Sequence, residues 1–219
     1  MAGYFGTLCA ILFFMISDSS LLARMRDRLA DHQPTLLSLN KPRAGVLVPM
    51  VAGAEPALLL TVRASHLNSH PGDVAFPGGM WETSDADLQQ TALRETDEEL
   101  NIPPDRVSVL GPLSTGLSKT GVQVYPYVGV IEQLDGCRAS PDEIESWFTV
   151  PWSFFATTEP ELQPIRRHGI EFHLPHYHYE RWHIWGLTAM ILLELINLVE
   201  ETDWPLPPFS QVTRPGRGG

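Results

Sequence analysis

Cysteine and basic residues are both scarce in this sequence. Two cysteines, Cys9 and Cys137, occur among 219 residues, so the chain cannot carry a disulfide framework, and it lacks the Cys-x-x-Cys spacing of many zinc and redox sites. Lysine and arginine together number 15 against 26 aspartates and glutamates, which gives a formal net charge of −11. This charge argues against the phosphate backbone of nucleic acid as a partner. We therefore expect a protein of the reducing cytoplasm that does not bind nucleic acid.

A long hydrophobic run is also missing. The apolar segment at the N-terminus, MAGYFGTLCAILFFMIS, has too few consecutive apolar residues to cross a bilayer easily. No Lys or Arg precedes it, and no small-x-small cleavage site follows it, so it does not resemble a signal peptide. We expect residues 1–17 to be an extension, with translation beginning at Met15 and no stable membrane association. A weak membrane-surface segment is the alternative.

The length fits one domain with terminal extensions, and we place that domain at residues 18–203. An amphipathic helix is predicted from Asp18 to His32. It follows from four apolar residues at helical spacing: Leu21, Leu22, Met25 and Leu29. Residues 204–219 are rich in proline and glycine, and we expect them to be disordered.

Strands and helices alternate along the predicted domain. Four segments are predicted as strands, PRAGVLVPMV, PALLLTVRA, RVSVLGPL and GVQVYPYVGVIE, with STGLSKTG as the loop between the last two. The aromatic segment IESWFTVPWSFF suits buried packing. The segment TAMILLELINLVE is apolar on nearly all sides and predicts a buried helix that starts near Thr188. The pattern predicts an α/β domain in which a mixed sheet lies between helices.

One further helix is predicted between Ser84 and Asn101. Ser84 followed three residues later by Asp87 resembles a capping box, while Asn101 and then Pro103 provide the stop. At about 100° per residue, the glutamates of this helix share one face, which we expect to point away from the core. They are Glu95, Glu98 and Glu99.

This acidic face predicts a cation. Like charges three and four residues apart destabilise an isolated helix by a few tenths of a kcal/mol per pair, which a cation would offset. Oxygen ligands favour Mg²⁺ or Mn²⁺, and Mg²⁺ commonly combines one or two carboxylates with substrate phosphates. Arg94 can lock the glutamates or the loop through a forked hydrogen bond, and Gly78 and Gly79 allow a close backbone approach. The alternative is a solvated acidic helix face.

The segment from the glycine pair onward resembles the signature of the Nudix hydrolases: Gly, five residues, Glu, seven residues, then Arg-Glu-apolar-any-Glu-Glu-any-Gly-apolar. Asn101 replaces the last glycine, and Thr96 stands at an apolar position. Fourteen residues separate Gly79 from Arg94, one more than in the signature, and Asp85 lies near the usual glutamate. The residues that match are Arg94, Glu95, Glu98, Glu99 and Ile102.

With this extra residue the chain resembles the coenzyme A diphosphatase branch of that family. Three segments resemble the same branch: LLTVRASHLNSHPGDVAFPGG, VYPYVGVI and IWGLTAMIL. The resemblance spans about Leu36 to Val199 and implies a Nudix-type α/β/α sandwich. It also implies Mg²⁺- or Mn²⁺-dependent hydrolysis of the diphosphate bond of coenzyme A or its thioesters, giving 4′-phosphopantetheine and adenosine 3′,5′-bisphosphate. The alternatives are a Nudix diphosphatase for another nucleotide, such as ADP-ribose or a dinucleotide cofactor, and a non-catalytic nucleotide-sensing domain. The oligomeric state is left open.

The resemblance also implies roles for the matching residues. Glu95 and Glu99 would hold metal ions, and Glu98 would be a further ligand or the proton acceptor for water, with Arg94 beside them in the catalytic group. The identity of the general base stays open among the glutamates.

Further contacts are implied upstream of the glycine pair. Resemblance to the coenzyme A branch implies that Arg63, His66 and His70 contact substrate phosphates; the alternative is that they are surface residues at a strand end. His70-Pro71-Gly72 can expose backbone N–H groups as a small anion nest. We interpret Lys119 as a solvated loop lysine, with phosphate binding as the alternative.

Two other polar segments have plain interpretations. The histidine-rich segment RRHGIEFHLPHYHYERWH fits no common zinc spacing, so we expect structural or surface histidines on a strand that returns to the last helix. We interpret Asp142, Glu143 and Glu145 as a solvated acidic turn. The alternative is that they cap or line the site, and that one of them is a distal base.

Overall fold

The computed structural model describes residues 21–67, 71–167 and 170–207. The expected extension at residues 1–17 therefore lies outside the described residues, as does the expected disordered tail beyond residue 207. The prediction of disorder is wrong for residues 204–207, because the Asn197 side-chain amide donates to the Trp204 carbonyl at 2.9 Å and Leu206 packs against a core cluster. Residues 21–31 form the helix that the N-terminal spacing predicts. Among the described residues, no helix is long and apolar enough to cross a membrane.

A mixed sheet of eight strands forms the centre of the molecule. Its main path has the order β3-β2-β1-β7-β5, while β4 pairs with β1, β6 with β7 and β8 with β2. β1 and β7 are parallel and the other pairs are antiparallel, so the predicted mixed sheet is confirmed. The strands are β1 (Arg43–Val51), β2 (Ala57–Arg63), β3 (Val74–Ala75), β4 (Gly78–Met80), β5 (Val107–Pro112), β6 (Gly116–Leu117), β7 (Gln123–Ile131) and β8 (Ile144–Pro151).

The four strands predicted from sequence correspond to β1, β2, β5 and β7. The segment predicted as a loop between the last two contains β6, because Gly116 and Leu117 pair with β7 next to the turn. A two-residue strand carries too little alternation to be recognised from sequence.

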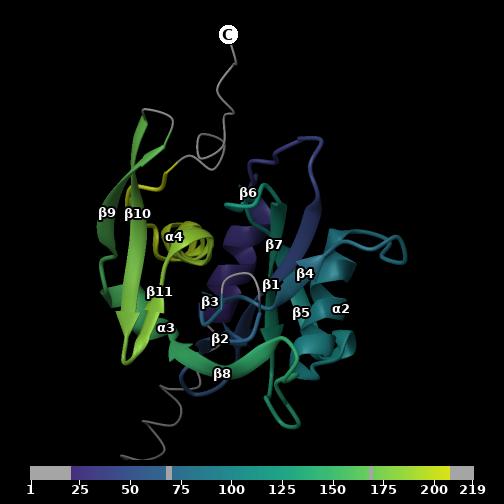
Figure 1. Cartoon of the computed structure of the whole chain (residues 1–219). Helices are drawn as coiled ribbons and strands as arrows, with labels where there is room; N and C mark the ends of the chain where they lie inside the picture. The colour runs from purple at the N-terminus through teal and green to yellow at the C-terminus, as the bar shows by residue number, and fades with distance from the viewer. Residues whose placement is uncertain (1–20, 68–70, 168–169, 208–219) are drawn as a thin grey trace, which may run out of the picture.

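Helices cover both faces of this sheet. α2 (Leu88–Leu100) lies on one face, and α4 (Gly186–Glu200) lies with residues 21–31 on the other (Figure 1). The larger core cluster joins apolar side chains from residues 21–31, β1 and α4. A smaller cluster contains Leu59, Leu100, Ile102 and Ile131. The expected α/β/α sandwich is confirmed, and α4 begins slightly before the expected Thr188.

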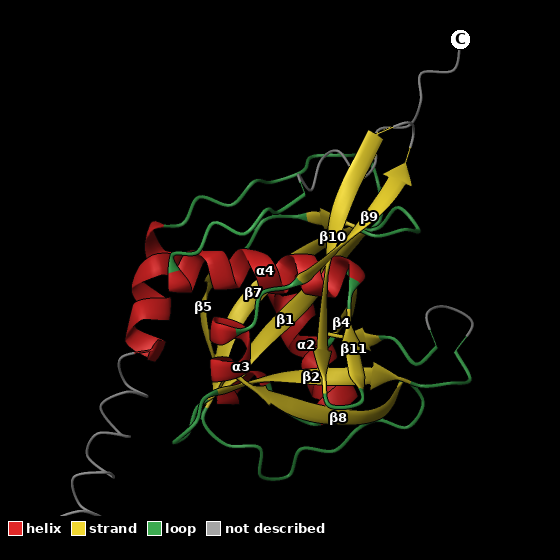
Figure 2. Cartoon of the chain, turned by 90° about the vertical axis from the view of Figure 1, so that its left-hand side faces the viewer, coloured by secondary structure: helices red, strands yellow, loops and turns green. Residues whose placement is uncertain are grey.

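A second sheet packs against α4. Its strands β9 (Glu161–Arg167), β10 (Ile170–Tyr179) and β11 (Trp182–Ile184) are antiparallel, in the order β11-β10-β9. Figure 2 shows the β9–β10 hairpin crossing α4, where Leu174 of β10 packs with Met190. The sequence predicts one strand that returns to the last helix, whereas the structure has a small sheet of three strands there.

The aromatic segment joins the two sheets. It forms β8 and the short helix α3 (Trp152–Thr157), in which Trp152 and Phe155 are buried. The ring of Phe155 meets that of Tyr177 on β10 edge to face, with 5.5 Å between ring centroids. The predicted buried packing of this segment is confirmed at these rings.

Candidate active site

α2 is held at both ends by side chains that the sequence provides locally. It starts at Leu88, because the Asp87 carboxylate accepts a hydrogen bond from the Gln90 N–H at 2.8 Å. The predicted start at Ser84 is therefore wrong. Asn101 ends the helix with φ of 55°, and its N–H donates to the Asp97 carbonyl at 2.7 Å, which confirms the predicted stop.

The residues before α2 do not join the helix, because the Asp85 carboxylate holds this segment through hydrogen bonds to three other residues. Its carboxylate accepts from the Glu82 N–H at 3.1 Å and from the Thr91 hydroxyl at 2.9 Å. It also receives a two-point contact from Arg94, whose Nε lies 3.0 Å from Oδ1 and whose Nη2 lies 3.1 Å from Oδ2. This fork lowers the pKa of Asp85 to about 2 and raises that of Arg94.

Arg94 also contacts β4 and the glutamates, as predicted, but its forked hydrogen bond is made with Asp85. Its Nη2 donates to the Met80 carbonyl at 3.1 Å and lies 3.0 Å from Glu95 Oε1. Its Nη1 donates to Glu98 Oε2 at 3.0 Å. One guanidinium thus fixes the start of α2, the end of β4 and two of the predicted site carboxylates.

Three carboxylates converge at the buried side of α2. Carboxylate oxygens of Glu95, Glu99 and Glu143 all lie within 4.8 Å of one another, and we call these three residues the acidic group. Glu99 is buried, Glu95 is half-buried and Glu143 is exposed. The structure does not bring Glu98 into this group, since its side chain is 58% exposed and held by Arg94.

The glycine pair lets the acidic group pack against backbone. Gly78 donates its N–H to Glu99 Oε2 at 3.2 Å. A Cβ on Gly79 would lie 2.4 Å from the Glu95 carboxyl carbon, and a Cβ on Gly78 would lie 2.4 Å from the Gly45 carbonyl oxygen. The predicted close approach is confirmed, and the partners are a carboxylate and strand β1.

The expectation that the glutamate face points away from the core is wrong for Glu99. Only 3% of this residue is exposed, because β4 and the glycine pair lie over that side of α2. Thr96 and Leu100 of the same helix are fully buried as well. α2 is therefore buried on more sides than an amphipathic surface helix. On the Glu99 side it is buried by the backbone of β4, which approaches the carboxylates.

The acidic group fits a hard divalent cation. Burial raises the pKa of Glu99 to about 8, with Glu143 and Glu95 adding repulsion against the Gly78 hydrogen bond and the charge of Arg63. Burial also raises the pKa of Glu95. Three carboxylates in one place disfavour their own ionisation, and a bound cation removes that penalty. All the donors are oxygens, which Mg²⁺ and Mn²⁺ prefer.

Glu143 is the member of the acidic group that sequence reasoning placed in a solvated turn. The Ala64 N–H donates to the Glu143 carbonyl at 2.9 Å, and the Ser140 N–H donates to the Glu99 carbonyl at 2.8 Å. These bonds tie the turn before β8 to the end of β2 and to α2. The alternative that this turn lines the site is the one the structure favours, although no local signal separates Glu143 from Glu145.

The upstream candidates have different positions. Arg63 ends β2 close enough to Glu99 for its charge to lower the pKa of that carboxyl. His66 Nε2 lies 3.1 Å from the Asp142 carbonyl oxygen, next to Glu143. The Gly72 N–H donates to the Arg63 carbonyl at 3.0 Å, so this donor of the expected anion nest is engaged. His70 lies outside the described residues.

The histidine-rich segment forms a stack on the second sheet. His176 Nδ1 lies 2.8 Å from His183 Nε2, and the rings of His178 and His183 are parallel with centroids 4.5 Å apart. We call these three residues the histidine stack. Burial lowers the pKa of His176 and His183. Within the described part of the chain, the acidic group is the only group of three or more His, Cys, Asp or Glu side chains whose ligand atoms all lie within 4.8 Å of one another.

A helix that carries the run Arg-Glu-x-x-Glu-Glu against a strand that begins Gly-Gly, on one face of a mixed sheet, defines a hydrolase of the Nudix class. A family model described as NUDIX domain matches residues 41–171, which is more than half of the chain. The chain belongs to the Nudix hydrolase family.

Relatives and solved structures agree with this assignment. A Salmonella dublin protein named uncharacterized Nudix hydrolase NudL is 42% identical over 177 residues, covering 78% of this chain and 89% of the relative. A protein of the same name from Enterobacter sp. (strain 638) is 43% identical over 159 residues, covering 72% and 82%. The crystal structure of a MutT/nudix family protein from Enterococcus faecalis has the same fold, with a TM-score of 0.51 at 16% identity, over 78% of this chain and 66% of that chain.

Proposed function

We propose that this Nudix hydrolase cleaves the diphosphate bond of coenzyme A or its thioesters, giving 4′-phosphopantetheine and adenosine 3′,5′-bisphosphate. One observation carries the proposal. The segment that resembles the coenzyme A branch, Leu59 to Gly79, ends at the acidic group: the Gly78 N–H donates to Glu99, and Arg63 acts on the same carboxyl through its charge. The residues of this resemblance are therefore neighbours of the predicted catalytic residues.

Glu95, Glu99 and Glu143 are the residues that would hold Mg²⁺ or Mn²⁺ in this proposal. A divalent cation supplies two things in such a site: it neutralises charge on the diphosphate, and it lowers the pKa of a coordinated water. The residues of the chain then have separate tasks. Arg94 fixes the orientation of Glu95 and Glu98 through its hydrogen bonds, so that neither carboxylate has to reorganise during the reaction.

The bond changes follow from hydrolysis of an acid anhydride. The oxygen of water bonds to one phosphorus atom, the bond between that phosphorus and the bridging oxygen breaks so that the bridging oxygen leaves with the other phosphate group, and a proton from water passes to a carboxylate. Glu98 has the exposure to accept that proton and return it to solvent, while Glu99 is buried. The choice of base among the glutamates stays a prediction.

A substrate panel tests the proposal. Coenzyme A, ADP-ribose and dinucleotide cofactors are incubated with the full chain and Mg²⁺ or Mn²⁺ in ¹⁸O-labelled water, and the products are weighed by mass spectrometry. We expect coenzyme A to have the highest kcat/KM, with the label in one product only, since one phosphorus atom is attacked. Faster hydrolysis of ADP-ribose would move the enzyme to the alternative substrate class, and no hydrolysis of any compound would favour the nucleotide sensor.

A further inference from the structure

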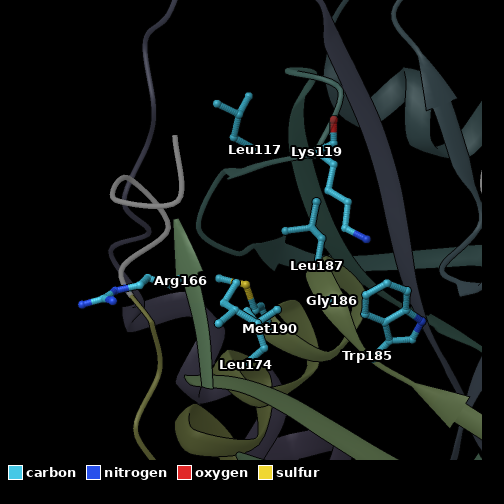
Figure 3. A pocket seen from close by; sticks show the side chains of 10 residues that line it. Leu117, Lys119, Arg166, Leu174, Trp185, Gly186, Leu187 and Met190 are labelled. Carbon is cyan, nitrogen blue, oxygen red and sulfur yellow. The ribbon is translucent and has the colours of Figure 1, made fainter. Parts of the chain in front are cut away.

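An apolar pocket lies between the second sheet, α4 and the turn after β6. Its volume is about 320 Å³. Figure 3 shows Leu117, Leu174, Leu187 and Met190 gathered around it, with Trp185 at one side. Ile165 of β9 packs with the same apolar cluster. Nothing in the proposed hydrolysis uses this cavity, which is lined mainly by aliphatic carbon.

The charged groups of the pocket are cationic. Lys119 and Arg166 are its two charged residues, and no carboxylate is among the described residues that line it. In Figure 3 the Arg166 guanidinium points away from the other side chains, whereas Lys119 extends toward Trp185. The ammonium of Lys119 lies 4.0 Å from the centre of a Trp185 ring, so one donor stands at the wall of an otherwise apolar cavity.

A second pocket adjoins this cavity on the side of Arg63. It has a volume of about 170 Å³ and shares Lys119, Trp185 and Leu187 with the apolar pocket. Its lining also includes Asp73 and Arg63, and the charge of Arg63 acts on Glu99. The two pockets together thus run from Arg63 past the Lys119–Trp185 pair to the aliphatic side chains.

We infer that the apolar pocket binds the acyl chain of a coenzyme A thioester, and that the enzyme selects acylated over free coenzyme A. The inference rests on the proposed function. The occupant has to be apolar at one end, polar in its middle, where Lys119, Arg63 and Asp73 lie, and anionic at the end that a cation held by the acidic group would bind. An acyl thioester has this sequence of groups, and Lys119 stands where a thioester or amide carbonyl would accept a hydrogen bond.

Chain length gives the pocket a measurable signature. Each methylene buried in an apolar site contributes at most about fourfold to affinity. We expect kcat/KM to rise by about tenfold or more from coenzyme A to its hexanoyl thioester, and to stop rising once the chain fills the cavity. A purely structural cavity would leave kcat/KM independent of the acyl chain.

Two variants of one residue and a matched control test the inference. Ile165→Trp fills the cavity, so the kcat/KM ratio of hexanoyl to free coenzyme A should fall to about one. Ile165→Ala enlarges the cavity, so the preferred chain should become longer. Leu162→Trp places the same bulk at a half-buried leucine of β9 that does not line the pocket, and should keep the wild-type ratio. Thermal melting of each variant confirms folding before its kinetics are compared.

Direct binding separates this inference from the proposed function. Octanoyl-pantetheine, which has no phosphate, is titrated calorimetrically into wild type, Ile165→Trp and Leu162→Trp. Binding to wild type and Leu162→Trp but not to Ile165→Trp supports the pocket, even if another diphosphate proves to be the better substrate. Equal kcat/KM for all chain lengths on an enzyme that hydrolyses coenzyme A, or binding unchanged in Ile165→Trp, overturns the inference and leaves the hydrolase proposal intact.

Discussion

The acidic group and the histidine stack are both clusters of ionisable side chains, but they balance their charge in different ways. In the histidine stack the rings of His176 and His183 hydrogen-bond and stack on one another, and burial lowers the pKa of both. In the acidic group, carboxylates approach one another within 4.8 Å, and Gly78 provides a hydrogen bond to Glu99.

This difference indicates which cluster is built for a ligand. The histidines hydrogen-bond and stack on one another, so we expect the loss of one to weaken the second sheet. The buried Glu99 is stabilised by protonation or by a cation, because burial and the neighbouring carboxylates oppose its charge. A cluster of partly buried carboxylates that repel one another is a candidate binding site.

The largest expected effect comes from Glu99→Gln. Glutamine keeps the shape and can still accept the Gly78 hydrogen bond, but it removes a charged ligand. We expect kcat/KM on the best substrate to fall by about 1,000-fold, since a bound cation contributes several kcal/mol to the transition state. Steady-state kinetics with Mg²⁺ measure it. Wild-type turnover by the folded variant would remove Glu99 from the site.

The second prediction concerns the pH dependence of stability without metal. The pKa of Glu99 is raised to about 8 in the folded protein, so its contribution is present at low pH and is lost as pH rises toward 8. Between about pH 5 and pH 8, wild type should lose about 3 kcal/mol of unfolding free energy relative to Glu99→Gln. Chemical denaturation in chelator measures the difference. If the difference in unfolding free energy between wild type and Glu99→Gln does not change with pH, the raised pKa of Glu99 is contradicted.

The third prediction separates the phosphates of the substrate. Arg63→Ala should lower kcat/KM on coenzyme A by about 10- to 100-fold, which corresponds to about 1.5–3 kcal/mol for a charged hydrogen bond. Dephospho-coenzyme A lacks the 3′-phosphate and serves as the matched substrate. A loss on coenzyme A alone places Arg63 on that phosphate, an equal loss on both places it on the diphosphate, and no loss on either excludes Arg63 from binding.

The smallest effect is expected from the histidine stack. His183→Asn should leave turnover of coenzyme A within about twofold and lower the unfolding free energy by about 1 kcal/mol through the lost hydrogen bond to His176. Because the pKa of His183 is lowered, its contribution to the free energy of unfolding is present above about pH 6.5 and is lost as pH falls below that value. The free energy of unfolding of the variant should therefore depend less on pH in this range. A rise in melting temperature with Zn²⁺, absent in the variant, would indicate a zinc site instead.

Much of the acidic group was predictable because its signals are local. Arg94, Glu95 and Glu99 lie within six residues, the glycine pair precedes them, and Asn101 ends their helix. The burial of Glu99 was not predictable from helical spacing, because the cover is backbone that arrives from β4 rather than side chains on α2.

Glu143 and the second sheet depend on contacts between distant parts of the chain. Glu143 reaches the acidic group because β8 pairs with β2 and the Ala64 N–H binds its carbonyl, and neither contact leaves a pattern near residue 143. The sheet formed by β9, β10 and β11 replaces the single strand expected from the histidine-rich segment. Its apolar side becomes apparent only when Leu174 meets Met190 of α4.

The most direct test of the account is whether Glu143 helps to bind a divalent cation. Mn²⁺ is titrated calorimetrically into wild type, Glu143→Gln and Glu145→Gln; the last changes an exposed glutamate two residues away. The account predicts that Glu143→Gln weakens Mn²⁺ binding by at least about tenfold, since even residues that only support a ligand typically contribute 10- to 100-fold. It also predicts wild-type affinity for Glu145→Gln. Equal affinities for all three folded proteins would contradict the assignment of Glu95, Glu99 and Glu143 as one cation site.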